Sequence, residues 1–176
     1  MKIRINKEQS SLLNCFMSRD IGRHVLRHYG VKGGYLYATD GRRCVRFKMN
    51  FPIKDGTYKA FTDGQDAYLF EVDDLFPSAD KIMPDFSRLV EICKISPQKS
   101  DGISIANAII DIYSKTKRPL NIKYITDLDI GGHREYSVFT KKGEETDAGG
   151  YLYFQGNFED NFFGKPEIVI LPYRKE

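Results

Sequence analysis

Basic side chains gather in the first third of the sequence, where they could bind phosphate groups. Residues 1–50 hold eleven Lys and Arg against three acids, whereas the whole chain has a formal net charge of only +3. Lys and Arg on one face can neutralise the phosphates of nucleic acid without reading its bases. A solvated basic face would give the same bias, so both alternatives stay open. The candidates for DNA contact are Lys7, Arg19, Arg23 and Arg27.

Histidine and cysteine are the next side chains that could do chemistry. His24 and His28 are four residues apart, but no carboxylate at a fitting offset completes a metal-ligand set. Cys15, Cys44 and Cys93 match no metal-site or disulfide spacing, so we expect three reduced core residues. The sequence contains no nucleophile elbow, phosphate loop or Ser-His-Asp pattern. We therefore expect a binding protein rather than an enzyme, without catalytic residues, metal or cofactor.

An Asp-Gly pair between two apolar runs is the most recognisable local feature. The stretch Tyr35-Leu-Tyr-Ala-Thr-Asp-Gly-Arg-Arg43 predicts a strand, a tight turn at Asp40-Gly41 and the start of a second strand. Glycine tolerates the positive φ that such a turn needs. The turn would present Thr39 and Arg43 at a defined edge, although Asp-Gly pairs also mark ordinary hairpins.

The elements that would position these residues follow from the hydrophobic periodicity. Asn6 can cap a helix, and the alternation that precedes and follows this helix is typical of strands. A Lys32-Gly33-Gly34 turn separates two of the strands. In the first half we predict a helix over residues 7–17 and strands over 2–5, 24–31, 35–38, 44–49 and 66–72.

We expect the second half to repeat the pattern of the first after a connecting region. Residues 76–84 are typical of an extended connector, and the peptide Gly-Gly-Tyr-Leu-Tyr occurs at both 33–37 and 149–153. Polar, glycine-containing loops are expected at 141–150 and 155–165. We predict helices over residues 85–94, 104–117 and 123–128, and strands over 120–122, 136–140, 151–154 and 167–171.

Composition bounds the class of protein. With 176 residues, 41% apolar and 29% charged, the chain is long enough for one compact globular unit. It has no apolar run of the roughly 18 residues that span a bilayer, and its start lacks the apolar core of a signal peptide. We therefore expect a cytoplasmic protein without a membrane partner.

Three segments in a fixed order resemble the bacterial DNA polymerase III beta subunit, the sliding clamp. The first runs from Ser18 through the Tyr35–Arg43 loop, which is similar to the family's Ala-Thr-Asp-Gly-His-Arg-Leu loop. The second is Phe76-Pro-Ser-Ala-Asp-Lys-Ile-Met-Pro84, similar to the family's Phe-Pro-Asp-Tyr connector. The third is Val169-Ile-Leu-Pro-Tyr-Arg174, similar to the final Met-Pro-Met-Arg strand, with a helix-like segment upstream at 121–128.

The resemblance implies an α+β fold, namely a DNA-clamp-like domain of two β-α-β-β-β units with helices packed on antiparallel sheet. The first unit would cover about 1–75, a connector and helical insertion about 76–119, and the second unit about 120–176. In the family the three segments surround a hydrophobic pocket that receives short peptides of replication and repair proteins. The implied pocket residues here are Thr39, Gly41, Arg42, Arg43, Cys44, Pro77, Lys81, Ile82, Val169, Leu171, Pro172, Tyr173 and Arg174.

The resemblance also sets the expected partners. An apolar cup with Arg at its rim suits an extended peptide that inserts two or three hydrophobic side chains and carries acidic or amide groups. Double-stranded DNA is a second expected partner, because the family's helices face the channel that holds DNA. The family's chain holds three domains and closes a ring from two chains. This shorter chain would need to form a homo-oligomer of several copies to encircle DNA, or it does not encircle DNA at all.

Departures from the family pattern leave alternatives open. Arg42 stands in place of the loop's usual His, Cys44 in place of Leu, and Tyr173 in place of a Met that makes the pocket pliable. The chain could act as a reduced clamp or as a decoy for clamp-binding partners, encoded by a phage or mobile element. It could also be a nucleic-acid-binding protein that kept the fold and lost the pocket, or an enzyme with an unrecognised site.

Overall fold

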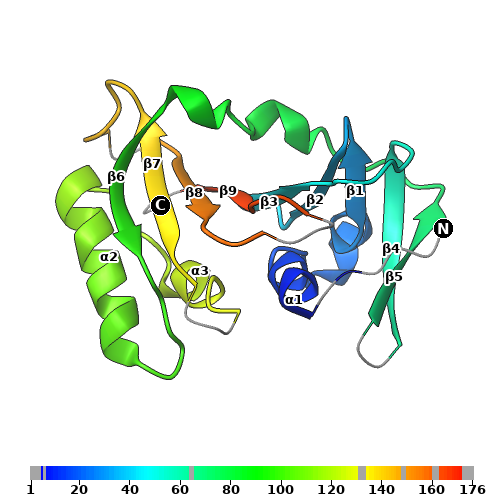
Figure 1. The fold of residues 1–176 in the computed structure, drawn as a ribbon, viewed down its shortest axis with the longest axis horizontal. Helices are drawn as coiled ribbons and strands as arrows, with labels where there is room; N and C mark the ends of the chain where they lie inside the picture. Colours follow the sequence, from blue (N-terminus) through cyan, green and yellow to red (C-terminus); the bar gives the residue numbers. More distant parts are fainter. Residues whose placement is uncertain are drawn as a thin grey trace. The chain divides into compact units, whose positions relative to one another are not determined.

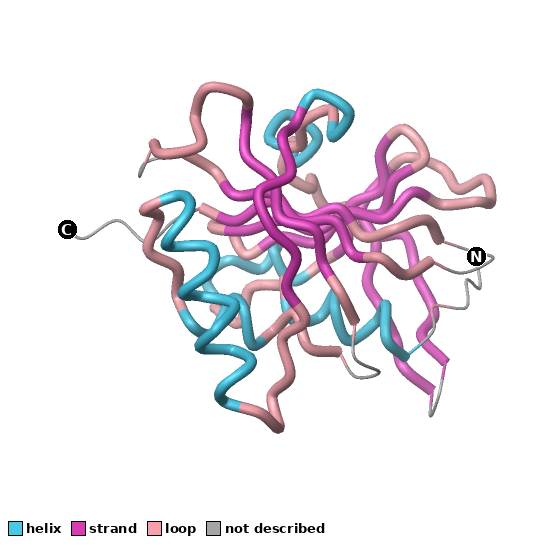
Figure 2. The backbone as a smooth tube through the Cα atoms, turned by 60° about the vertical axis from the view of Figure 1, so that its left-hand side comes forward, coloured by secondary structure: helices cyan, strands magenta, loops and turns pink. Residues whose placement is uncertain are grey.

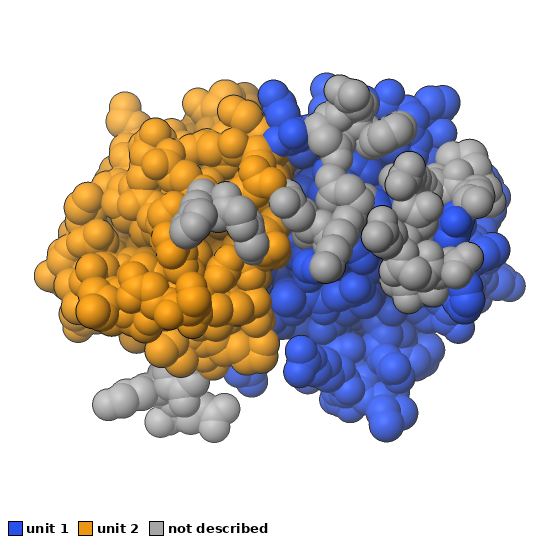
Figure 3. All heavy atoms as spheres, turned by 60° about the horizontal axis from the view of Figure 1, so that its bottom comes forward, with its two compact units in different colours: residues 1–82, 159–164 blue, residues 83–158, 165–176 orange. Residues whose placement is uncertain are grey.

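The computed structural model of the chain describes residues 5, 7–63, 66–130, 134–147, 150–159 and 163–171. The chain divides into two units, which Figure 3 colours separately. Unit 1 is Met1–Ile82 with Glu159–Gly164, and unit 2 is Met83–Phe158 with Lys165–Glu176. Antiparallel strands and a few helices build both units (Figure 1), which confirms the predicted α+β class.

Unit 1 is an antiparallel sheet with helix α1 (Lys7–Cys15) on one face. Alternating residues of β1 and β2, such as Tyr29, Val31 and Leu36, are almost fully buried on this face. The Tyr29 hydroxyl donates to Asn14 Oδ1 at the end of α1, at 2.6 Å. The strands β1 (Tyr29–Lys32), β2 (Tyr35–Thr39), β3 (Arg43–Lys48), β4 (Gly56–Asp63) and β5 (Asp66–Val72) lie in the order β5-β4-β1-β2-β3.

Most of the elements predicted for unit 1 are confirmed. The exception is the strand predicted over 24–31, because Ile21–Arg27 forms the 3-10 helix η1 and only β1 follows it. The cause is local, since the Asp20 carboxylate accepts from the Gly22 N–H and starts a helical turn that alternation does not reveal. Strand β4 was not predicted, and the strand predicted at 2–5 falls outside the described residues except for Ile5.

Unit 2 has the same plan, with helices α2 (Gly102–Thr116) and α3 (Ile122–Thr126) packed against each other. Helix α2 also lies against strand β6, as Figures 1 and 2 show. The Tyr136 hydroxyl donates to the Leu128 carbonyl beyond α3, in the way that Tyr29 is bound in unit 1. The strands β6 (Leu89–Ile95), β7 (Tyr136–Lys141), β8 (Leu152–Gly156) and β9 (Glu167–Ile170) lie in the order β9-β8-β7-β6.

Two predictions for unit 2 are wrong. Residues 85–94 form the short 3-10 helix η3 (Phe86–Arg88) and then β6, rather than a helix. A register shift at Glu91/Cys93, where β6 pairs with β7, interrupts the alternation and makes the apolar spacing resemble that of a helix. The strand predicted at 120–122 is absent because Asn121 caps α3, its side chain accepting from the Lys123 N–H.

These corrections change where the second β-α-β-β-β unit begins. Its elements are β6, α2, β7, β8 and β9, with α3 between α2 and β7. The segment expected as a connector and insertion at 76–119 therefore supplies the first strand and the main helix of unit 2. The connector itself is not wholly extended, since Ala79–Ile82 forms the 3-10 helix η2.

The repeated Tyr-Leu-Tyr peptide falls at equivalent places in the two units. It begins β2 in unit 1 and leads into β8 in unit 2, each the middle strand of three consecutive antiparallel strands. Leu36 and Leu152 are fully buried, and Tyr37 and Tyr153 are nearly so. Sequence similarity of five residues thus marks a real structural repeat.

A glycine on β1 shapes the sheet face of unit 1 opposite α1. Gly30 is paired with Tyr37 on β2 and with Thr57 on β4, and directly paired residues share a face. Gly30 therefore leaves a gap between their side chains. The ring of Phe76 occupies it so closely that a Cβ on Gly30 would lie 2.1 Å from Phe76 Cδ1. Two hydrogen bonds of Thr57 Oγ1 fix the backbone of residues 74–76 against the sheet. The hydroxyl donates to the Asp74 carbonyl at 2.6 Å and accepts from the Phe76 N–H at 3.0 Å.

A buried arginine organises unit 2. Helix α2 ends at Thr116, and Lys117 caps it with a φ of 57°. This turn brings Arg118 into the interior, where it has no exposed surface. Its guanidinium donates to the carbonyl of Tyr151 at 2.9 Å and to those of Glu144 and Asp147. Burial lowers the pKa of Arg118, but the three carbonyl oxygens that accept its hydrogen bonds stabilise the charged guanidinium. Arg118 thereby fixes the β7–β8 loop to the end of α2.

We predict that Gly30→Ala destabilises unit 1, because the added methyl group cannot coexist with the Phe76 ring. The expected loss is about 1–3 kcal/mol in the free energy of unfolding, measured by urea denaturation followed by circular dichroism. Gly102→Ala is the matched control, since a Cβ there meets nothing within 4 Å. Equal stability of the two variants would show that Phe76 does not pack on Gly30.

We predict that Arg118→Met destabilises the protein by about 2–4 kcal/mol, because three carbonyls lose a charged donor inside unit 2. Arg88→Met is the control, since the Arg88 side chain is 85% exposed and its Nε forms a surface ion pair with Asp85. Thermal unfolding of both variants measures the difference. A melting temperature of Arg118→Met that matches the control would contradict the role assigned to Arg118.

Candidate functional site

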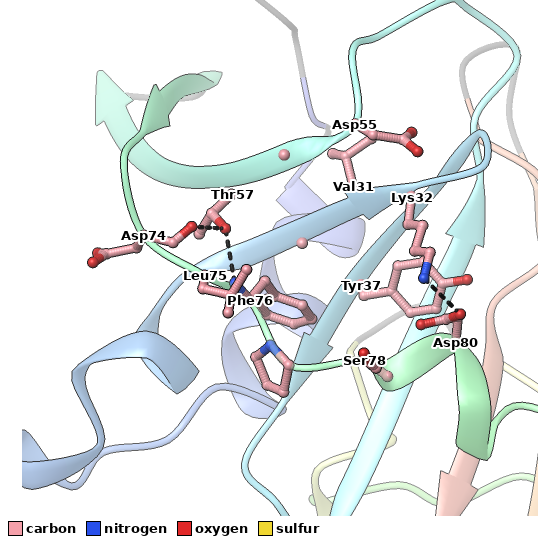
Figure 4. A pocket seen from close by; sticks show the side chains of 14 residues that line it. Val31, Lys32, Tyr37, Asp55, Thr57, Asp74, Leu75, Phe76, Ser78 and Asp80 are labelled. Atoms are coloured by element: carbon pink, nitrogen blue, oxygen red, sulfur yellow. Dashed lines mark hydrogen bonds and ion pairs between the residues drawn. The ribbon is translucent and has the colours of Figure 1, made fainter.

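A hollow of about 380 Å³ opens on the face of unit 1 opposite α1 (Figure 4). Strands β1, β2 and β4 supply its floor through Gly30, Tyr37 and Thr57. The segment that follows β5 crosses this face and supplies the wall through Leu75, Phe76 and Pro77. The close packing of Phe76 on Gly30 brings the segment that follows β5 onto the sheet, where it borders the hollow.

The wall of the hollow is largely apolar. Leu75 is 89% exposed, so its side chain is available to an apolar group of a ligand. The Tyr37 ring is almost fully buried in the sheet, and burial raises the pKa of its hydroxyl. An apolar side chain of a ligand could therefore lie between Leu75 and the aromatic floor.

The rim of the hollow carries acidic side chains and one lysine. Lys32 Nζ lies 2.9 Å from Asp80 Oδ2, and this hydrogen bond lowers the pKa of Asp80. Asp80 Oδ1 is enclosed and accepts no hydrogen bond from the described residues. Asp55 Oδ1 accepts from the Gly33 N–H at 2.9 Å.

The third carboxylate of the rim, Asp74, faces a buried histidine. His28 Nδ1 lies 3.2 Å from Asp74 Oδ2. Burial lowers the pKa of His28 and outweighs the attraction of Asp74, which would raise it. His28 is therefore neutral at pH 7 and does not cancel the charge of Asp74. Three carboxylates against one ammonium make the rim negative, which favours a cation or an N–H donor on the ligand.

Three of the loop residues predicted to line the peptide pocket make contacts within unit 1 instead. Arg43 Nε lies 2.8 Å from Asp40 Oδ2, its Nη2 donates to the Cys15 carbonyl at 2.6 Å, and its guanidinium lies over the Phe16 ring. Thr39 Oγ1 donates to the Arg43 carbonyl at 2.8 Å, and Cys44 is fully buried.

The outward part of the same loop is its tip. Gly41 has a φ of +87° at the first central position of the turn, as a type II′ hairpin needs. Gly41 and Arg42 are both exposed. Of the loop residues assigned to the peptide pocket, these two are therefore the ones available to a partner from unit 1.

The remaining predicted pocket residues come from two units. Pro77 lines the hollow, while Lys81 and Ile82 are exposed in η2. Val169, in β9 of unit 2, is buried and pairs with Tyr153, and Leu171 just beyond is half-buried. Pro172, Tyr173 and Arg174 lie outside the described residues. The pocket that combines all these residues stays a prediction.

The residues of the hollow other than Pro77 were not predicted from the sequence. Gly30 gives no signal by itself, because its importance depends on the register that places it between Tyr37 and Thr57. The run Asp73-Asp74-Leu75-Phe76-Pro77, with carboxylates next to apolar side chains, was the available signal.

The predicted DNA-contacting residues lie around η1 and at the start of α1. Arg19 and Arg27 are exposed, and the Arg23 side chain is 57% exposed with Nε 3.6 Å from Asp20 Oδ2. Lys7 is the first residue of α1. The arginines are thus available to an anionic partner, although Asp20 reduces their local excess of charge.

Cysteine and metal-binding side chains give no further site in the described part of the chain. All three cysteines are free, as expected, but only Cys44 is fully buried, whereas Cys15 and Cys93 are half-buried. Among the residues whose positions are described, no group of three or more His, Cys, Asp or Glu could hold a metal. None of the helices in the described ranges has the length and apolar character to cross a bilayer.

Comparisons with known proteins place the fold. The sequence matches no protein-family model and no curated protein. The structure is similar to the DNA polymerase sliding clamp from Bacillus subtilis, with a TM-score of 0.53 and 14% identity over 100% of this chain and 65% of that one. It is also similar to the H. pylori beta clamp in complex with diflunisal, with a TM-score of 0.57 and 8% identity over 99% of this chain and 66% of that one.

The chain thus spans slightly less than two thirds of the length of each clamp. The order of the elements agrees with the likeness, because each unit contains a helix and three consecutive antiparallel strands. At such low identity the likeness concerns the fold rather than the ligands. The protein therefore has the fold of the bacterial DNA polymerase III beta sliding clamps.

Proposed function

We propose that this protein is a clamp-like binding module of DNA replication, which binds short peptides of its protein partners and has no catalytic activity of its own. The observation that carries the proposal is the hollow of unit 1, where apolar and aromatic groups lie within an acidic rim. Its size suits one or two side chains of an extended peptide rather than a folded domain. The clamp fold supports the replication context.

The chemistry of the hollow indicates what the peptide should carry. An apolar residue such as Leu or Phe would lie against Leu75 and Tyr37 and contribute about 1.5–3 kcal/mol before ordering costs. Asp55, Asp74 and Asp80 favour a Lys or Arg next to this anchor. The sequence indicates acidic or amide groups instead, because arginine is expected at the rim of the predicted pocket. Arg43 is instead bound to Asp40 and Cys15 within unit 1.

We predict that a labelled peptide containing Leu-Phe beside two lysines binds with a dissociation constant near the micromolar range, measured by fluorescence anisotropy. Leu75→Ser should weaken binding by about tenfold or more, because the peptide anchor loses its apolar partner. Ile21→Ser is the matched control, since Ile21 is 81% exposed and does not line the hollow. The same peptide with two aspartates should bind more weakly.

Equal affinity of Leu75→Ser and Ile21→Ser would reject the hollow as the peptide site. The pocket predicted from the sequence gives a different pattern. If that pocket binds the peptide, Arg42→Ala and Ile82→Ser should weaken binding while Leu75→Ser should not. Absence of binding by either peptide at millimolar concentration would reject peptide binding as a whole.

A second candidate function is DNA binding through the η1 region, which the exposure of Arg19, Arg23 and Arg27 favours. We predict that any binding to duplex DNA falls steeply with salt and is lost in the double variant Arg19→Glu/Arg27→Glu. Leu75→Ser should leave DNA binding unchanged. Electrophoretic mobility shift at several salt concentrations tests this, and salt-independent binding would argue against phosphate contacts.

A further inference from the structure

Helix α2 has apolar side chains on two opposite sides. Its inner side places Ile105, Ala108 and Ile112 in the interior of unit 2, against β6 and α3. A helix with one packed face is expected to be polar on the other, and a helix that is apolar all round is normally buried all round. The outer side of α2 departs from this rule.

The outer side carries an apolar stripe, which we define as Ile103, Ala106, Ile110 and Tyr113. Ile103 is 72% exposed, Ile110 61% and Tyr113 50%, and Ala106 is also exposed. The separations are three, four and three residues, which is the spacing of the seam between two packed helices. Single exposed apolar residues are common on proteins, but a stripe along a whole helix marks a contact surface.

The charges at the two ends of α2 are opposite. Asp101 caps the first turn, with its side chain accepting from the Ile103 N–H at 3.0 Å. Lys115 and Lys117 lie at the other end, and the Lys117 ammonium is 5.9 Å from the centre of the Tyr113 ring. At the first end the Lys99 ammonium is directed to the Asp129 carbonyl. The stripe thus begins next to a carboxylate and ends next to an ammonium group.

This arrangement is self-complementary for an antiparallel pair of helices. In such a pair Asp101 of one copy lies opposite Lys115 of the other, and the helix dipoles oppose each other. Lys117 lies opposite Lys99, whose ammonium is directed to the Asp129 carbonyl of its own chain. A parallel pair would bring like charges together at both ends. With a twofold axis near Ala108, Ile103 meets Tyr113 of the second copy and Ala106 meets Ile110 of the second copy.

We propose that the apolar stripe of α2 is covered by a second copy of this chain, through antiparallel packing of α2 on α2. The stripe has no cation in its centre, so it does not suit a phosphate backbone. A seam of about two heptads is short, and the pair is therefore a reversible dimer with a dissociation constant on the order of micromolar. The proposal does not rest on the hollow of unit 1, and peptide binding there can fail without affecting it.

Sedimentation velocity of the full chain, over a concentration range from about 1 to about 300 micromolar, tests the proposal. We expect a monomer–dimer equilibrium that Ile110→Asp shifts by at least about a hundredfold towards monomer. Ile122→Asp is the matched control, because Ile122 is as exposed as Ile110, at 61%, but lies on α3 outside the stripe. Thermal unfolding should show that both variants remain folded, since both positions face solvent in the single chain.

Cysteine crosslinking tests the orientation. Ile103→Cys mixed with Tyr113→Cys should give a disulfide between the two variants, while each variant alone gives little. In a parallel pair each variant would instead crosslink with itself, because like positions face each other. A chain that stays monomeric throughout the range, a dimer that Ile110→Asp leaves intact, or self-crosslinking of the single variants would each overturn the proposal.

Discussion

The contact between the Phe76 ring and the backbone of Gly30 is the constraint on which the proposed site depends. Because Gly30 has no side chain, the residues after β5 can cross the sheet at close range, and Thr57 fixes that approach through two hydrogen bonds. Leu75 and Pro77 are then held at the wall, and Asp74 and Asp80 at the rim. Any side chain at position 30 would displace this segment and reshape the hollow.

In each unit a buried guanidinium attaches a loop between two strands to the end of a helix. Arg43 joins the β2–β3 turn to the end of α1, and Arg118 joins the β7–β8 loop to the end of α2. In both cases backbone carbonyls accept from the arginine. Arg43 also forms an ion pair with the Asp40 carboxylate, whereas the three printed acceptors of Arg118 are all carbonyls. Arg43 in the loop Tyr35–Arg43 thus stabilises the fold of unit 1, and its presence there does not by itself indicate a ligand.

Prediction from the sequence succeeded where periodicity was regular and failed where a local feature altered it. The hairpin at Asp40-Gly41, helix α2 and the strands of the repeated Tyr-Leu-Tyr peptide were predicted. The bulge in β6 disguised that strand as a helix, and the cap by Asp20 turned part of a predicted strand into η1. The hollow was beyond prediction, because Gly30, Thr57 and Phe76 meet only through the register of β1 with β4.

We propose that the hollow next to Gly30, rather than the tip of the Asp40-Gly41 loop, receives the peptide. Titration of isotope-labelled protein with the Leu-Phe-Lys-Lys peptide, followed by nuclear magnetic resonance of the backbone amides, tests it most directly. We expect saturable shifts at Gly30, Thr57 and Phe76, with the amides of Arg42 and Leu171 unchanged. Shifts centred on Arg42 and Leu171, with the amides around the hollow unmoved, would contradict it.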